Sequence, residues 1–88
     1  MAAYELKVAA SAERALARLP EFAAAAIVEF LTGPLLENPQ RVGKPLGLEL
    51  ADYHCARRGA YRIVYRIEEP RAVLVVRIDH RTDVYRRR

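Results

Sequence analysis

The sequence has 88 residues, a net charge of +4 and a hydrophobic share of 52%. This length predicts one domain, residues 1–88, and excludes two independent cores. The longest apolar run (residues 22–28) is far shorter than the roughly 20 residues of a spanning helix. With no secretory leader and one cysteine, we expect a cytoplasmic protein without membrane contact or internal disulfide.

The first elements are a strand and an amphipathic helix. Residues 4–8 (YELKV) alternate apolar and polar side chains, which predicts a half-buried strand. Ser11 then stands where an N-cap is expected. Residues 12–19 place Ala and Leu on one helical face and Glu and Arg on the other. Pro20 fits either the end of this helix or the first turn of the next one.

A second helix and a loop follow. Residues 21–32 carry an apolar stripe, and Gly33 with Pro34 is a strong stop signal. The two helices are therefore expected to form a helical hairpin. Residues 34–47 contain three prolines and two glycines, which predicts a loop with at most one helical turn near residues 35–37.

The remaining pattern is that of strands. Residues 48–58 and 61–68 predict a β-hairpin around a two-residue type II′ turn at Gly59 and Ala60. Residues 72–78 (AVLVVRI) form an apolar run typical of a strand covered on both faces. The predicted fold class is α+β in the order β-α-α-β-β-β. A helical hairpin packs on one face of a small antiparallel sheet.

Positive charge is concentrated in the second half of the chain. Residues 1–40 hold three basic and five acidic side chains, whereas residues 41–88 hold twelve and six. Thirteen of the fifteen basic residues are arginines, whose planar groups suit phosphate contacts and stacking on bases. The pattern favours a polyanionic partner, nucleic acid first. The alternative is solvated surface charge.

The predicted hairpin sets arginines against each other. Arg57 falls opposite Arg62 on one face of the sheet, and such a like-charge pair is destabilising unless an anion bridges it. A four-residue turn at residues 68–71 would place Arg77 opposite Arg62 as a third cation. The other face, with Tyr61 and Tyr65, can serve the core. The alternative is that the long arginine stems extend to water and pair with acidic residues.

Several other chemistries lack the residues they need. Ser11, the only serine, is expected to cap a helix, so no serine triad is available. His54 and Cys55 are neighbours on a strand and point to opposite faces. No zinc spacing and no glycine-rich phosphate loop is found, so we expect no metal and no cofactor. Arginines, tyrosines and two histidines suit metal-free phosphodiester chemistry.

Two segments together resemble a known family. ARRGAYRIVYRI, followed by DHRTDVYR, resembles the RelE/ParE superfamily of bacterial toxins, in its RelE branch. The resemblance covers almost the whole chain. It implies a toxin that cuts messenger RNA in the ribosomal A site, without metal, by attack of a ribose 2′-hydroxyl on the adjacent phosphate. The implied partners are the ribosome, mRNA and a cognate antitoxin encoded next to the toxin, in a hetero-oligomeric complex.

The resemblance also implies roles for residues. Arg62 matches the arginine that holds the scissile phosphate, and Arg81 the arginine that protonates or stabilises the leaving oxygen. Tyr85 matches a tyrosine that stacks on the substrate base and orients the 2′-hydroxyl. His80 adjoins this set. The residues expected to contact RNA or phosphate are Arg57, Arg58, His54 and Arg77.

One departure from the family concerns the general base. Some members carry a pair of lysines in the strand before the hairpin, where this chain reads YHCAR. A guanidinium cannot accept a proton at neutral pH, whereas an imidazole can. We expect His80, which directly precedes Arg81, to be the assisting base. His54 should share the face of Tyr65, away from Arg62.

Two other functions stay open at this point. The first is a ParE-like inhibitor of DNA gyrase, which binds without catalysis on a similar fold. The second is a basic domain that binds RNA without cutting it. The set of Arg62, Arg81 and Tyr85 favours the endoribonuclease, because a gyrase inhibitor does not need it.

Overall fold

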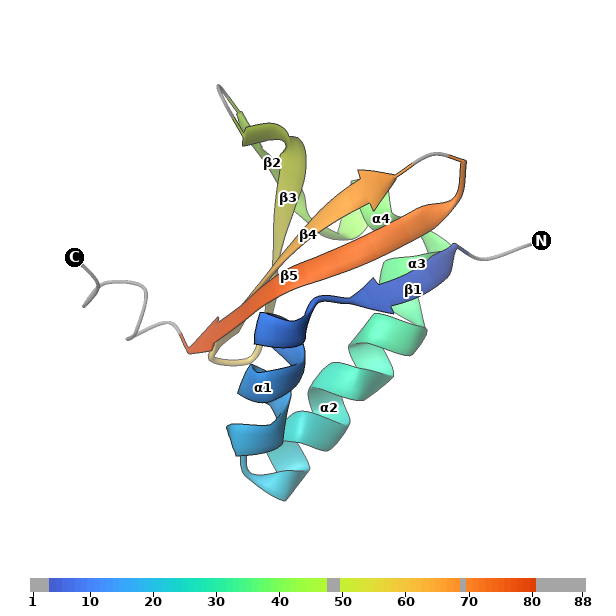
Figure 1. Ribbon diagram of the computed structural model, residues 1–88. Helices are drawn as coiled ribbons and strands as arrows, with labels where there is room; N and C mark the ends of the chain where they lie inside the picture. The colour runs from blue at the N-terminus through green and yellow to red at the C-terminus, as the bar shows by residue number, and fades with distance from the viewer. Residues whose placement is uncertain (1–3, 48–49, 69, 81–88) are drawn as a thin grey trace.

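Figure 1 shows the computed structural model of the chain, an α+β fold in which the helices cover one face of a single sheet. The structure describes residues 4–47, 50–68 and 70–80. The five strands lie in the order β1-β5-β4-β3-β2, and the predicted fold class is confirmed. The elements are β1 (Glu5–Val8), α1 (Ala10–Arg18), α2 (Glu21–Thr32), α3 (Pro34–Glu37), α4 (Pro39–Val42), β2 (Lys44–Gly47), β3 (Leu50–Arg58), β4 (Tyr61–Glu68) and β5 (Ala72–His80).

The sheet is mixed rather than wholly antiparallel. β1 pairs with β5 in parallel, from Glu5 opposite Ala72 to Val8 opposite Val75, while the other neighbouring strands are antiparallel. A parallel pair needs a long crossover, which the helices and the next three strands supply here. Since β1 ends at Val8, it pairs only with the first half of β5.

The helices begin differently from the prediction. α1 starts at Ala10 with Ala9 as its N-cap residue, so the predicted capping role of Ser11 is wrong. The Ser11 hydroxyl instead donates a hydrogen bond to the carbonyl of Val76 in β5, at 2.9 Å. This bond fastens the first turn of α1 to the strand. Pro20 is the N-cap residue of α2.

Residues 34–47 are more ordered than the predicted loop. They contain the short helices α3 and α4, and then the edge strand β2. β2 pairs with β3, with Lys44 opposite Cys55 and Gly47 opposite Leu50. An edge strand tolerates Pro45, because a missing N–H there need not cost a ladder hydrogen bond.

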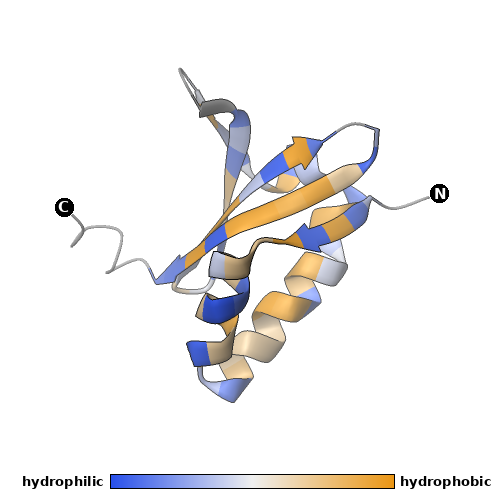
Figure 2. Cartoon of the chain, viewed as in Figure 1, coloured by the Kyte–Doolittle hydropathy of each residue, from blue (hydrophilic) through white to orange (hydrophobic). Residues whose placement is uncertain are grey.

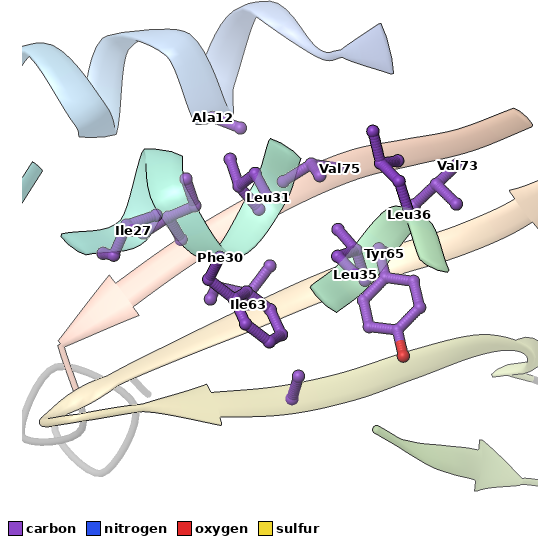
Figure 3. Packing of buried hydrophobic residues seen from close by; sticks show 12 residues of the cluster. Ala12, Ile27, Phe30, Leu31, Leu35, Leu36, Ile63, Tyr65, Val73 and Val75 are labelled. Atoms are coloured by element: carbon purple, nitrogen blue, oxygen red, sulfur yellow. The ribbon is translucent and has the colours of Figure 1, made fainter. Parts of the chain in front are cut away.

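The core lies between the helices and the sheet (Figure 3). Tyr65 of β4 is fully buried there, and its hydroxyl donates a hydrogen bond to the carbonyl of Pro39. Burial raises the pKa of this phenol to about 12. The other large, fully buried side chains are Ile27, Leu31, Leu35, Pro39, Ile63, Val73 and Val75.

β5 is apolar along most of its length and turns hydrophilic towards its C-terminal end (Figure 2). The prediction that β5 is covered on both faces is wrong, because the helices cover one face only (Figure 1). Val73 and Val75 are buried on that face, whereas Leu74 and Val76 are only partly buried. We call the uncovered face the open face.

The β3–β4 hairpin has the predicted register. Arg57 lies opposite Arg62 and Arg58 opposite Tyr61. Gly59 in the turn has a φ of 62°, in the left-handed region that glycine adopts at little cost.

The register between β4 and β5 differs from the prediction. Arg62 lies opposite Asp79 rather than Arg77. The turn between Glu68 and Ala72 is one residue shorter than predicted, and a β-bulge leaves Val76 as an extra residue. The bulge reverses the alternation of β5, so that Ile78 is buried while Arg77 and Asp79 lie on the open face.

Candidate functional site

The hairpin end of the open face carries a row of charged residues on three strands. Arg57 of β3, Arg62 of β4 and Asp79 of β5 are successive cross-strand neighbours. Arg57 is exposed, whereas Arg62 and Asp79 are partly buried. Residues directly opposite in a sheet have Cβ atoms about 5 Å apart, so the Arg57–Arg62 pair carries a repulsion that a bound anion would relieve.

A groove of about 550 Å³ lies beside this row, between β2 and the hairpin. We call it the basic groove and define it by Gly43, Lys44, Cys55, Arg57 and Arg62, which line it. Lys44 lies opposite Cys55, and Cys55 is two residues before Arg57 on β3. The three cations therefore share the open face, and no acidic residue in the described part of the chain lines the groove.

Lys44 is the residue that the sequence analysis missed. The prediction placed it in a loop, because Pro45 and two flanking glycines argue against a strand. Its position depends on the pairing of β2 with β3, a tertiary contact that no local pattern reveals. Some members of the family that this chain resembles carry lysines in the strand before the hairpin. β3 has no lysine, but Lys44 of the neighbouring strand β2 lies beside the hairpin.

The Cys55 thiol reports the electrostatics of the basic groove. Its pKa is raised, chiefly by burial. The positive charges of Arg62 and Arg57 oppose this shift, in that order. The negative charge of Asp79 adds to the shift, so the Cys55 thiol is affected by all three members of the charged row.

Three of the predicted site residues lie on the helix-facing side of the sheet instead. His54 stacks on Tyr65 with ring centroids 5.5 Å apart, which confirms the predicted face of His54. The Arg58 guanidinium lies 6.0 Å from the Phe30 ring centroid. His80 meets Tyr61 edge to face at 5.2 Å.

Arg58, Tyr61 and His80 line a separate hollow of about 490 Å³. Phe22 of α2, which is 80% exposed, forms part of its wall. The structure therefore brings together Arg57, Arg62 and Lys44 but not His80 with them. The role of His80 as a base stays a prediction.

The remaining predicted residues lie at the end of β5 or beyond it. Arg77 forms an ion pair with Asp79 at 3.0 Å. Arg81 and Tyr85 lie outside the described residues, so their roles stay predictions.

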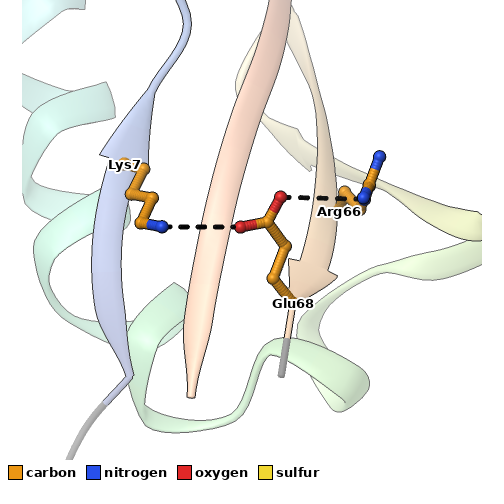
Figure 4. A network of polar contacts seen from close by, with 3 residues as sticks. All are labelled: Lys7, Arg66 and Glu68. Atoms are coloured by element: carbon orange, nitrogen blue, oxygen red, sulfur yellow. Dashed lines mark ion pairs between the residues drawn. The ribbon is translucent and has the colours of Figure 1, made fainter. Parts of the chain in front are cut away.

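The far end of the open face has a different charge balance (Figure 4). Glu68 lies between Lys7 and Arg66, with nitrogen–oxygen distances of 3.7 and 3.8 Å. These two cations therefore share one acidic partner at the end of the sheet away from the hairpin.

Two further properties concern only the part of the chain that the structure describes. No group of three or more His, Cys, Asp or Glu side chains there could hold a metal ion. No helix there is long and apolar enough to cross a membrane.

Comparisons with known proteins agree with this architecture. A family model described as the ParE toxin of the type II toxin–antitoxin system parDE matches residues 6–85. The RelG toxin of Mycobacterium tuberculosis is 49% identical over 85 residues, which cover 96% of this chain and 98% of that one. The RelE toxin of the same organism is 50% identical over 84 residues, with coverages of 94% and 87%.

Solved structures show the same fold. The toxin–antitoxin complex RelBE2 of Mycobacterium tuberculosis contains a chain with a TM-score of 0.86 and 46% identity, and the match covers 94% of this chain and 97% of that one. The isolated E. coli RelE toxin, at 24% identity, matches with a TM-score of 0.75 over 94% and 92%. Fold and sequence together define a toxin of a type II toxin–antitoxin system. The chain belongs to the ParE toxin family, within the RelE/ParE superfamily, and both curated relatives carry RelE-type names.

Proposed function

We propose that this toxin is an endoribonuclease that cleaves messenger RNA in the ribosomal A site and thereby inhibits translation. The observation that carries the proposal is the basic groove, in which Lys44, Arg57 and Arg62 line one concave surface. A phosphodiester is an anion that such a surface fits, and arginine binds phosphate through two parallel hydrogen bonds.

The proposed reaction is an internal transfer at phosphorus. The ribose 2′-oxygen bonds to the adjacent phosphorus and loses its proton to a base, while the bond to the next 5′-oxygen breaks and that oxygen is protonated. Negative charge grows on the non-bridging oxygens, and Arg62 and Arg57 stabilise it because they are already in place. Lys44 contributes a further positive charge from β2.

The other roles are proposed from the family resemblance. Arg81 stabilises the leaving 5′-oxygen, and Tyr85 stacks on the base and orients the 2′-hydroxyl. His80 accepts the proton of the 2′-hydroxyl. In the structure His80 packs against Tyr61, so this role requires substrate to reach past the end of β5.

An antitoxin and the cytoplasmic ribosome are the proposed partners. Related solved structures are toxin–antitoxin complexes, which supports a cognate antitoxin encoded next to this chain and a hetero-oligomeric complex. A segment that covers the basic groove should be acidic, because it has to neutralise three cations there.

The test is to add purified protein to a translating extract and map the new 5′ ends of the mRNA. We expect ends within codons that occupy the A site, and none when the same mRNA lacks ribosomes. Unchanged mRNA in extracts whose translation stops would reject the nuclease.

The second candidate is inhibition of DNA gyrase without catalysis. The observation that favours it is the description of the matching family model as a ParE toxin. A supercoiling assay with purified gyrase tests it directly. Inhibition of supercoiling together with intact mRNA would replace the proposed function by this one.

A further inference from the structure

A second basic hollow lies at the edge of the sheet, between α1 and the end of β5. Its volume is about 350 Å³. We call it the edge hollow and define it by Ser11, Arg14, Arg18, Arg77 and Asp79, which line it. The described residues contribute three arginines and one carboxylate to its lining.

The spacing of the two arginines in α1 is unfavourable for the stability of this helix. Arg14 and Arg18 are four residues apart, which puts them on one helical face, and like charges at this spacing destabilise a helix. Both are exposed, and neither makes an ion pair with any described residue. Solvated arginines on a convex surface would not indicate a binding site, but these two line a hollow.

Two features of β5 hold the edge hollow in shape. β1 ends at Val8, opposite Val75, and among the described elements α1 lies beside the rest of β5. The bulge at Val76 puts Arg77 on the open face, and the Ser11 hydroxyl binds the carbonyl of that bulged residue. The same bulge therefore fixes α1 and places Arg77.

The edge hollow continues the charged row of the basic groove. Asp79 lines the hollow and lies directly opposite Arg62, which lines the groove. Neighbouring strands are about 4.8 Å apart, so β3 and β5 are separated by about 10 Å. Cations thus extend from Lys44 across the hairpin end of the sheet to α1, and Asp79 is the one carboxylate that the described residues contribute to the two linings.

We propose that the edge hollow binds the phosphodiester backbone of RNA flanking the phosphate held in the basic groove. Arg14 and Arg18 contact the backbone, and Arg77 joins them while its pair with Asp79 keeps it in place. These contacts carry no base information and fix the register of the strand. The inference rests on the proposed function, because it extends the substrate beyond the reacting phosphate.

The test compares two double variants of equal charge. The first is Arg14→Gln with Arg18→Gln, and the control is Arg41→Gln with Arg71→Gln, whose arginines are exposed and line neither the hollow nor the groove. Binding is measured with a labelled single-stranded RNA of 2′-O-methyl nucleotides, which cannot be cleaved by 2′-hydroxyl attack. Thermal unfolding verifies that both variants fold.

The first variant should bind this RNA roughly tenfold more weakly at moderate salt, and the slope of log affinity against log salt should fall by about 1.4, for two lost phosphate contacts. The control should keep the slope of the parent protein. Equal losses of RNA affinity in both variants would overturn the proposal, because they would indicate non-specific electrostatic attraction between the RNA and the protein's net positive charge. Unchanged RNA binding with weakened antitoxin binding would assign the hollow to a protein partner and overturn it as well.

The outcome is separable from that of the proposed function, because binding needs no cleavage. RNA binding that depends on the hollow, without any cleavage on ribosomes, would reject the nuclease and keep the site. Cleavage on ribosomes with binding that is independent of the hollow would reject the site and keep the nuclease.

Discussion

Gly43 is the position where one added methyl group should disturb both the core and the basic groove. Its φ of −134° is ordinary extended backbone, so alanine causes no backbone strain there. Space is the obstacle. A Cβ would overlap the Tyr65 hydroxyl and lie 2.9 Å from the carbonyl oxygen of Cys55.

The expected cost of Gly43→Ala follows from these two contacts. Overpacking a well-packed site costs about 1–3 kcal/mol. Displacing the Tyr65 hydroxyl breaks its hydrogen bond to Pro39, and a buried unsatisfied group adds about 1–3 kcal/mol. A total of about 2–6 kcal/mol corresponds to a fall in Tm of roughly 10–50 °C for a domain of this size.

The assay is urea and thermal unfolding of a double-mutant cycle with Tyr65→Phe, which removes the hydroxyl. Gly43→Ala should cost at least about 1 kcal/mol less in the Tyr65→Phe protein, because one of the two contacts is gone. An equal cost in both backgrounds would refute the reasoning. So would a Gly43→Ala protein within about 0.5 kcal/mol of the parent.

Three more predictions follow from the site and its surroundings. The Tyr65 pKa is raised from 10.0 to about 12, so the folded state keeps a proton that the unfolded state loses. Stability should therefore fall by up to about 3 kcal/mol as pH rises from 10 to 12, and urea unfolding of Tyr65→Phe should lack this slope. Arg57→Ala should leave the free energy of unfolding unchanged or raise it by about 0.2–1 kcal/mol, because a like-charge pair is removed. The same variant should cleave mRNA more slowly. A destabilised variant would contradict this prediction. The raised pKa of Cys55 predicts alkylation slower than that of the unfolded chain at the same mildly alkaline pH, and equal rates would contradict it.

The hairpin was predictable because its signals are local. Gly59 marks the turn, and once the turn is fixed the pairing of Arg57 with Arg62 and of His54 with Tyr65 follows by counting. The apolar faces of the helices and strands likewise gave the layer arrangement. Local chemistry therefore predicted the two arginines of the basic groove.

The rest of the site depends on contacts between distant segments. The bulge at Val76 has no local signature, yet it decides that Asp79 rather than Arg77 lies opposite Arg62. Ser11 has the sequence position of a helix cap, but its hydroxyl donates a hydrogen bond to the carbonyl of Val76, 65 residues away. Lys44 joins the site only because β2 pairs with β3.

The most direct test of the central claim is the single-turnover rate of mRNA cleavage on programmed ribosomes for Arg62→Ala, with Arg66→Ala as the matched control. Both arginines lie on the open face of β4, but Arg66 is tied to Glu68 at the far end. Loss of one preorganised donor to the developing charge predicts a rate at least about 100-fold lower for Arg62→Ala. Arg66→Ala should cleave at the parent rate. Equal rates for the two variants would contradict the assignment of the basic groove as the site that holds the scissile phosphate.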